Sequence, residues 1–491
     1  MHARTRTRAG LIALALALAG CLANATAATA AAGAAPAEVG AADALLAQAG
    51  RFWQTVAADA PARPALLERH FSAGIRERNG DDKLLETFAM LAETLAPELA
   101  SLPPPERVGE DQPLAGELHY TLASGRRVAL TLTLTDTDPP RIERFSLRPL
   151  PPRIEAVGPT QLPGVIDARL TAEAAAGRFS GAVLVARGEE VIYERAVGLA
   201  DRASGRANTL DTPINLGSIN KMFTGIAIAQ LQAAGKLDWQ DTVGRHLPEF
   251  PNATVRDKAT IHQLLTHTSG VGSYWNAAHD ARLHELDSHQ AFLDTFVDEP
   301  LLFEPGQGLE YSNGGPVILG LIIEALSGSD YYQYIREHIY TPAGMTHADH
   351  YRRDDSEAGF AVGYTRDEDG RWRDHRAGLS LRGSAAGGGY ASARDLHAFS
   401  KALADGRLLP REKLETLWLA HVQTGPMGYG YLFSVGDRPG RRFVGHNGGA
   451  PGISAEFLHY PDHGLAIVVL ANQDHAAEPM REWLQAQVEA S

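Results

Sequence analysis

The stretch GSINKMFTG, residues 217–225, places a serine and a lysine three residues apart where a helical pattern begins. A buried helix face is predicted by apolar residues at helical spacing: Ile219, Met222, Phe223, Ile226 and Ala229. Ser218 and Lys221 would then share one face of the first turn. A serine hydroxyl attacks a carbonyl group poorly unless a base takes its proton, and a neutral lysine is such a base.

Lys221 is an unfavourable choice for the start of a helix, because the helix dipole disfavours a cation there by roughly 0.3–1 kcal/mol. The same dipole and a dry pocket lower a lysine pKa, and so favour the neutral base. The helix N-terminus also offers the Ser218 N–H to a developing oxyanion. The pattern S-x-x-K also occurs where a serine caps a helix and the lysine is solvated. Here it occurs once, in a chain with six lysines.

Two further motifs follow. Tyr311, Ser312 and Asn313 lie in LEYSNGG, between a turn-forming stretch and an apolar helix pattern. FVGHNGGAPGISAEF, residues 443–457, is a strand pattern that carries His446 and is interrupted by glycines. Glycine inside a strand often marks the close approach of a ligand or another backbone segment. Taken alone, the first motif is also an ordinary loop, and the second a bulge with a surface histidine.

These three motifs, in this order, resemble the serine β-lactamase and penicillin-binding family. The similarity is greatest to the branch whose second motif is Tyr-x-Asn, which contains class C β-lactamases, DD-peptidases and related esterases and D-aminopeptidases. The resemblance covers residues from about 165 to 490. Three further stretches support it: HQLLTHTSGV at 262–271, LFEPGQGLEYSNGG at 302–315 and AAGGGYASARDLHAFSKAL at 385–403.

The resemblance implies a role for each matching residue. Ser218 is the nucleophile that becomes acylated, and Lys221 is its proton-handling partner. Tyr311 shares the proton transfer, and Asn313 orients the substrate. The implied enzyme is a serine hydrolase that works through an acyl-enzyme, without metal or cofactor.

The third motif departs from the class C pattern. The resemblance places His446 at a substrate-binding position and makes the Gly449 N–H the second oxyanion donor. Class C β-lactamases have K-T-G where this chain has His446-Asn447-Gly448. A histidine with an ordinary pKa of about 6.5 is only partly cationic near neutral pH, and Asn447 replaces a hydroxyl residue. We therefore expect esters or D-amino-acid amides and peptides as substrates, with carboxylate binding falling as His446 loses its charge.

The elements that must position these motifs lie in a domain predicted over 165–491. Strand patterns occur at both ends of this domain, and helices with long loops lie between them. One antiparallel sheet built from the two ends, flanked by helices and joined to an all-helical region, explains this order. The predicted fold class is α+β, an α/β sandwich of the β-lactamase/transpeptidase type.

A smaller α+β domain is predicted over 41–150, with three helices followed by three strands. LPPPERVGEDQP, which begins at Leu102, is predicted as a loop between them. Residues 151–164 are rich in proline and glycine and are predicted as a linker. This domain resembles the accessory domains that precede such hydrolases, which is an analogy of fold only. A passive spacer and a substrate- or partner-binding module both remain open.

The N-terminus predicts export. Residues 1–20 combine arginines with a short apolar run, which is typical of a signal peptide and too short to span a bilayer. LAGC, ending at Cys21, resembles the bacterial lipoprotein box, so Cys21 is the predicted lipidation site. Residues 21–40 form an Ala-rich tether. The alternative is ordinary cleavage after Ala25, which would give a soluble periplasmic or secreted protein.

Composition narrows the function further. The net charge of −14 and the absence of a basic stripe argue against nucleic acid as a partner. A single cysteine excludes an intramolecular disulfide and a cysteine-based zinc site, and the histidines lack an accompanying set of metal ligands. The sequence thus predicts an exported serine hydrolase for a small-molecule ester, amide or peptide. The alternatives are a β-lactamase or DD-peptidase proper, and a slowly deacylating penicillin-binding or sensor protein.

Overall fold

The structure is a computed structural model, which describes residues 40–99, 102–112, 114–122, 127–150, 154, 157–355, 359–367, 369–424, 427–438 and 440–490. The chain divides into two compact units, Met1–Ile154 and Glu155–Ser491. Each unit is described by itself. Among the described residues, no helix has the length and apolar character needed to cross a bilayer.

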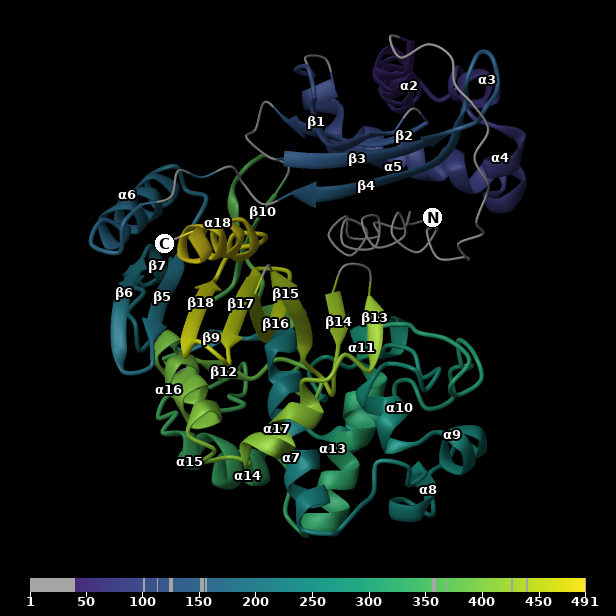
Figure 1. The fold of residues 1–491 in the computed structure, drawn as a ribbon. Coiled ribbons are helices and arrows are strands. Elements are labelled where there is room, and N and C mark those ends of the chain that lie inside the picture. The colour runs from purple at the N-terminus through teal and green to yellow at the C-terminus, as the bar shows by residue number, and fades with distance from the viewer. Residues whose placement is uncertain are drawn as a thin grey trace. The chain divides into compact units, whose positions relative to one another are not determined.

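The described part of the first unit places helices before an antiparallel sheet (Figure 1). Its helices are α2 (Gly40–Ala57), α3 (Arg63–His70), α4 (Ala73–Asn79) and α5 (Asp81–Leu99). Its sheet has the order β1 (Glu106–Gln112), β2 (Ala115–Thr121), β3 (Arg127–Leu134) and β4 (Ile142–Leu150). Phe52, Phe71, Phe88 and Phe145 pack their rings together between the helices and the sheet.

Two local predictions for this unit were wrong. The stretch predicted as a loop from Leu102 contains β1, whose Glu106 pairs with His119 of β2. β1 is an edge strand, and edge strands carry charged residues that hide the alternation of a buried strand. The three helices predicted for this unit are four among the described residues, because Phe71 takes an extended conformation between α3 and α4.

An antiparallel sheet forms the centre of the second unit. Its order is β13 (Val422–Thr424), β14 (Met427–Tyr429), β15 (Ser434–Arg438), β16 (Arg441–Ala450), β17 (Ile453–Tyr460), β18 (Leu465–Ala471), β5 (Gly181–Arg187) and β6 (Glu190–Val197). Leu470 of β18 pairs with Ala182 of β5, so the two ends of the domain are joined within one sheet. The predicted closure of the sheet by the two ends of the domain is confirmed.

Helices cover both faces of this sheet, as expected from strands that are apolar on both sides. Val183 and Val185 of β5 pack with α6 (Leu162–Ala175) and α18 (Ala477–Ala490) on one face. Leu184 points to the other face, where α7 (Lys221–Ala233) and α16 (Ala393–Ala404) lie. This alternation follows from the period of two along a strand.

The helical region is built around α7 and α13 (Gly314–Ser327), which pack against each other. Its other helices are α8 (Val243–His246), α9 (Ala253–Lys258), α10 (Ile261–Leu265), α11 (Ala277–Ala281), α12 (His289–Leu293), α14 (Tyr331–Ile335), α15 (Thr341–Ala343) and α17 (Arg411–Leu417), with the π-helix η2 (Arg336–Tyr340) and the 3₁₀ helices η1 (Gly217–Asn220) and η3 (Arg376–Gly378). Short strand pairs connect it to the sheet: β7 (Leu199–Asp201) with β8 (Arg206–Ala207), β9 (Ile214–Asn215) with β12 (Tyr390–Ala391), and β10 (Tyr364–Arg366) with β11 (Trp372–Asp374).

Candidate active site

Ser218 lies in η1, the 3₁₀ turn that leads directly into α7. Gly217, the residue before it, has φ of +50°, a conformation that side chains other than glycine rarely adopt. Lys221 is the first residue of α7, and the helix behind it is almost fully buried. The predicted buried helix face is confirmed, and a rigid core element therefore holds the serine and the lysine.

Lys221 has no exposed surface, and its Nζ contacts three polar groups. It lies 3.1 Å from Ser218 Oγ, 2.7 Å from Asn313 Oδ1 and 2.6 Å from the carbonyl oxygen of Ala386. The Asn313 amide is oriented by its Nδ2, which donates to Ser273 Oγ at 3.0 Å. Burial lowers the pKa of Lys221 well below its ordinary value.

Burial favours the uncharged amine, whose hydrogen bonds can then be assigned. A neutral Lys221 has two N–H groups for the oxygens of Asn313 and Ala386, which accept only. Nζ lies within donating distance of Ser218 Oγ at 3.1 Å, and in the neutral form its lone pair can take the Ser218 hydroxyl proton at this contact. The arrangement can therefore deprotonate Ser218 as the hydroxyl attacks a carbonyl carbon.

Tyr311 lies over the same centre from the segment before α13. Its ring centroid is 4.8 Å from Lys221 Nζ and 4.6 Å from that of His267. Protein atoms around the Tyr311 hydroxyl raise its pKa, although 43% of the residue's surface remains exposed; a hydrogen bond with Ser218 opposes this rise. Tyr311 is thus protonated at neutral pH and can donate its proton, which leaves Lys221 as the resting base.

A chain of hydrogen bonds runs behind Tyr311. The Ser312 N–H donates to His267 Nδ1 at 3.2 Å, so the His267 proton is on Nε2, which faces the Tyr429 hydroxyl at 3.1 Å. The Tyr429 hydroxyl in turn lies 3.0 Å from His446 Nε2. His446 Nδ1 lies 2.6 Å from the carbonyl oxygen of Asn447, which requires a proton on Nδ1. All the partners are satisfied when both histidines are neutral.

The expectation that His446 is partly cationic near neutral pH is wrong. Its ring is 4% exposed, and burial, followed by the nearby Lys221, lowers its pKa to about 3. Both ring nitrogens face protein groups, and His446 is not among the residues that line the cavity beside Ser218. The sequence could not reveal that His446 is buried and neutral, because its partner Tyr429 lies on β14, two strands away from β16 in the sheet.

The glycines of the third motif allow β16 to approach η1 backbone to backbone. A β-carbon at Gly448 would lie 1.9 Å from the carbonyl oxygen of Leu216, and one at Gly217 would lie 2.7 Å from the nitrogen of Gly449. The predicted close approach at these glycines is confirmed. It brings the backbone nitrogens of Ser218 and Gly449 to the same end of the cavity.

Sequence reasoning assigned no role to the loop that supplies Ala386. The Asn220 amide donates to the carbonyl oxygen of Ser384 at 2.9 Å, and the Thr224 hydroxyl donates to that of Ala385 at 2.7 Å. On its other side, the Ala385 N–H donates to Nε2 of the buried His289 at 2.9 Å. The available signal was the glycine run at 387–389, which follows this loop.

His289 is itself held by a carboxylate. Its Nδ1 lies 3.0 Å from Oε1 of Glu324 on α13. Because Nε2 accepts from Ala385, the proton must be on Nδ1, where it donates to Glu324. α12 and α13 thereby fix the loop that presents Ala386 to Lys221.

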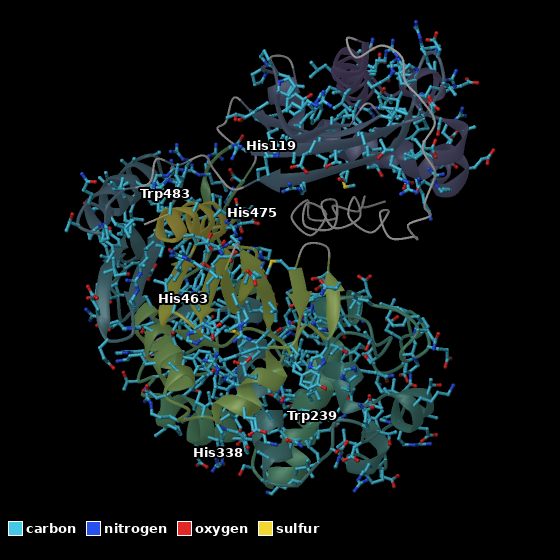
Figure 2. All side chains as sticks on the ribbon, viewed as in Figure 1. His119, Trp239, His338, His463, His475 and Trp483 are labelled. Atoms are coloured by element: carbon cyan, nitrogen blue, oxygen red, sulfur yellow. The ribbon has the colours of Figure 1, made fainter. Side chains whose placement is uncertain are left out.

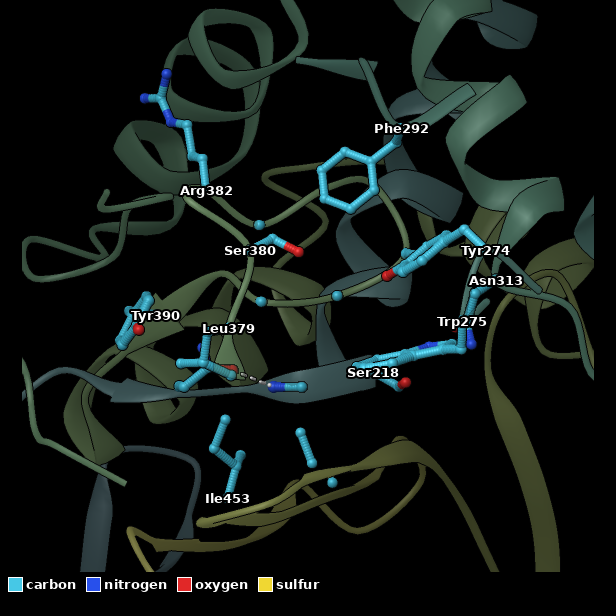
Figure 3. Close-up of a pocket in the computed structure, with 18 of the residues that line it drawn as sticks. Ser218, Tyr274, Trp275, Phe292, Asn313, Leu379, Ser380, Arg382, Tyr390 and Ile453 are labelled. Carbon is cyan, nitrogen blue, oxygen red and sulfur yellow. Dashed lines mark hydrogen bonds between the residues drawn. The ribbon is translucent and has the colours of Figure 1, made fainter. Parts of the chain in front are cut away.

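A cavity of about 230 Å³ opens beside Ser218 (Figure 3). Its walls are largely aromatic and apolar, with Tyr274 and Phe292 from the helical region and Ile453 from the sheet. The Arg382 guanidinium points away from Ser218, because it stacks on the Tyr332 ring and donates to a backbone carbonyl. The lining residues within the described part of the chain include no aspartate or glutamate: Asn215, Gly217, Ser218, Tyr274, Trp275, Phe292, Tyr311, Asn313, Tyr351, Arg353, Leu379, Ser380, Arg382, Gly383, Ala386, Gly387, Gly388, Tyr390, Gly449, Ala450 and Ile453.

Within the parts of the chain that the structure describes, no group of three or more His, Cys, Asp and Glu side chains could hold a metal ion. His338, His463 and His475 lie apart on the second unit (Figure 2). Cys21 lies outside the described residues.

A family model described as Beta-lactamase matches residues 166–491. The chain belongs to the Beta-lactamase family. Penicillin-binding protein 4* of Bacillus subtilis is 32% identical over 325 residues, which are 61% of this chain and 70% of that protein. Esterase EstB of Burkholderia gladioli is 37% identical over 186 residues, which are 34% of this chain and 46% of that protein.

Solved structures of other proteins share the fold. A penicillin binding protein from Bacillus halodurans has a TM-score of 0.60 at 31% identity, over 65% of this chain and 99% of that one. A D-stereospecific amidohydrolase from Streptomyces has a TM-score of 0.56 at 25% identity, over 68% of this chain and all of that one. The predicted family and fold class are confirmed, and the chain is a serine hydrolase of the Beta-lactamase family.

Proposed function

We propose that this chain is an exported hydrolase that cleaves esters or uncharged D-amino-acid amides through an acyl-enzyme on Ser218. The observation that carries the proposal is the position of Lys221, a fully buried amine that Asn313 and Ala386 hold 3.1 Å from Ser218 Oγ. Esterase and amidohydrolase relatives support the substrate class.

In the proposed reaction, Ser218 Oγ bonds to the substrate carbonyl carbon while its proton passes to Lys221 Nζ. The N–H groups of Ser218 and Gly449 stabilise the oxyanion, each such donor contributing about 2.7–4 kcal/mol. Lys221 then returns the proton through the Tyr311 hydroxyl to the leaving alcohol or amine as its bond to carbon breaks. Water attacks the Ser218 ester and gives a proton to Lys221. That proton restores Ser218 Oγ–H when the acid product leaves.

The neutral third motif supports a preference against β-lactams. Lys221 and His446 are both favoured in their uncharged forms, so neither offers the substrate carboxylate a permanent cation. We expect kcat/KM for a p-nitrophenyl ester to exceed that for a chromogenic cephalosporin at least about tenfold, or about 1.4 kcal/mol in transition-state binding.

Labelling with a fluorophosphonate tests the nucleophile. The wild type should label, and Ser218→Ala should not. Ser273→Ala removes a hydroxyl that accepts from the Asn313 amide and the Trp275 N–H but leaves Ser218 in place, so this variant should keep its label. Full labelling of Ser218→Ala would remove Ser218 from the mechanism.

The substrate preference is tested across about pH 5.5–8.5, a range that brackets an ordinary histidine pKa. The ester-to-cephalosporin ratio should stay constant, because His446 does not titrate there. His446→Lys, which restores the cation of the class C motif, should raise the relative cephalosporin rate. Equal rates on both substrates in the wild type would favour a β-lactamase. An initial burst without steady turnover would favour a slowly deacylating binding protein.

A further inference from the structure

Several large apolar side chains are exposed on the two segments that contribute Trp275 and Tyr311 to the cavity wall. Trp275 is 53% exposed, Leu302 57%, Leu309 40% and Tyr311 43%. A soluble surface tolerates single apolar residues, whereas several on neighbouring segments mark a contact site. We call these four residues the apolar rim.

Hydrogen bonds join the two segments that carry the apolar rim. The Leu302 N–H donates to the carbonyl oxygen of Gly270 at 2.9 Å, and the Gly314 N–H donates to that of Gly272 at 3.0 Å. The Gly306 N–H also donates to the carbonyl oxygen of Thr268 at 2.8 Å. The segments 268–275 and 302–314 therefore form one surface.

The apolar rim continues the wall of the cavity. Trp275 and Tyr311 belong to both the cavity wall and the apolar rim. The Leu302 side chain lies beside Gly272, where an added β-carbon would be 3.8 Å from it. A substrate held at Ser218 can thus extend from the cavity past Trp275 and Tyr311 onto the apolar rim.

We propose that the apolar rim binds the hydrocarbon chain of an ester substrate, beyond the part that the cavity encloses. The proposal rests on the proposed function of Ser218 and adds a preference for chain length. Exposed carboxylates on or beside the same segments, Asp298, Glu299 and Glu310, disfavour an anionic lipid surface as the occupant. A neutral hydrocarbon chain meets no such repulsion.

The rim should make kcat/KM rise with chain length once the chain leaves the cavity. A fully buried methylene contributes up to about fourfold in an equilibrium or rate ratio, and a half-exposed rim contributes less. We expect about twofold for each methylene in contact with the rim.

The test compares p-nitrophenyl acetate with the butyrate, hexanoate, octanoate and decanoate, and ethyl acetate with octyl acetate. The first series lengthens the acyl group, and the second lengthens the alcohol. Leu302→Ser and Leu309→Ser remove rim area. Val191→Ser is the matched control, because Val191 is 42% exposed on β6, which is the far edge of the sheet.

The decanoate-to-acetate or the octyl-to-ethyl ratio of kcat/KM should fall about tenfold in Leu302→Ser and stay unchanged in Val191→Ser. The series in which this ratio falls identifies whether the acyl group or the alcohol contacts the apolar rim. Ratios that are equal in wild type and rim variants overturn the proposal. If those ratios are equal and Leu302→Ser also reduces cosedimentation with phosphatidylcholine vesicles, the surface belongs to a bilayer instead. A folded wild type that hydrolyses no ester of either series would instead reject the proposed function.

Discussion

The amine of Lys221 lies 2.6 Å from the carbonyl oxygen of Ala386, a group that can only accept a hydrogen bond. Together with the Asn313 amide oxygen, it holds Nζ 3.1 Å from Ser218 Oγ. The buried position removes the solvation that an ammonium requires. The protein thus favours the basic form of Lys221 by burial.

A first prediction follows for stability against pH. The native pKa of Lys221 is lowered, so between that value and the unfolded pKa of about 10.4 the unfolded chain binds one more proton. Stability must therefore rise with pH in this window. The free energy of unfolding of the wild type should gain about 1.4 kcal/mol per pH unit relative to Lys221→Met.

Urea unfolding at several pH values between about 7 and 9.5 measures this slope. Lys236→Met serves as a control, because Lys236 is exposed. Parallel pH profiles for the wild type and Lys221→Met would mean that Lys221 stays charged in the folded protein.

A second prediction concerns Tyr311. Its protonated hydroxyl passes the proton to the leaving group, so Tyr311→Phe should lower kcat by about 10²–10⁴-fold. The double variant with Lys221→Met should cost little more than the worse single variant, because both residues serve one transfer. Tyr274→Phe, in the same cavity, is the matched control and should cost much less. Multiplicative losses would show that Tyr311 and Lys221 act independently.

A third prediction concerns His289, which is a positioning residue. His289→Leu removes the acceptor for the Ala385 N–H, so the Ala386 carbonyl should move away from Lys221. A displacement of about 1 Å can cost 10²-fold in rate. Loss of a carbonyl that stabilises the ammonium also lowers the Lys221 pKa, so the acid limb of kcat/KM should move to lower pH.

His289→Gln keeps an acceptor and should restore most of the rate. His350→Leu is the control, since His350 is equally buried among neighbouring tyrosines and its ring nitrogens have no hydrogen-bond partner within the described residues. If His350→Leu and His289→Leu lowered kcat equally with no change in the pH profile, both losses would come from disturbed packing, and His289 would have no positioning role.

A fourth prediction concerns export. We expect Cys21 to be lipidated, and Cys21→Ala to move the protein from the membrane fraction to the soluble fraction. Two or more acyl chains anchor a protein stably, whereas one does not. Mass spectrometry of the mature N-terminus decides between this and cleavage after Ala25, because a chain that begins at Thr26 carries no Cys21.

The sequence by itself determined the family, the order of the three motifs and the two-ended sheet. These features are local patterns: Ser218 and Lys221 are one turn apart, and apolar strand patterns occur at both ends of the domain, where β5 and β18 pair within one sheet. The edge strand β1 escaped prediction because its charged residues obscure the apolar pattern of a strand.

The tertiary structure decided the charge state of the site. His446 reads as an ordinary histidine in the sequence, but Tyr429 from β14 and burial against the sheet hold it neutral. Ala386 is an unremarkable alanine whose backbone oxygen reaches Lys221 across 165 residues of chain. Burial and hydrogen-bond partners depend on which distant segments pack together, and this packing sets the pKa values on which the proposed chemistry depends.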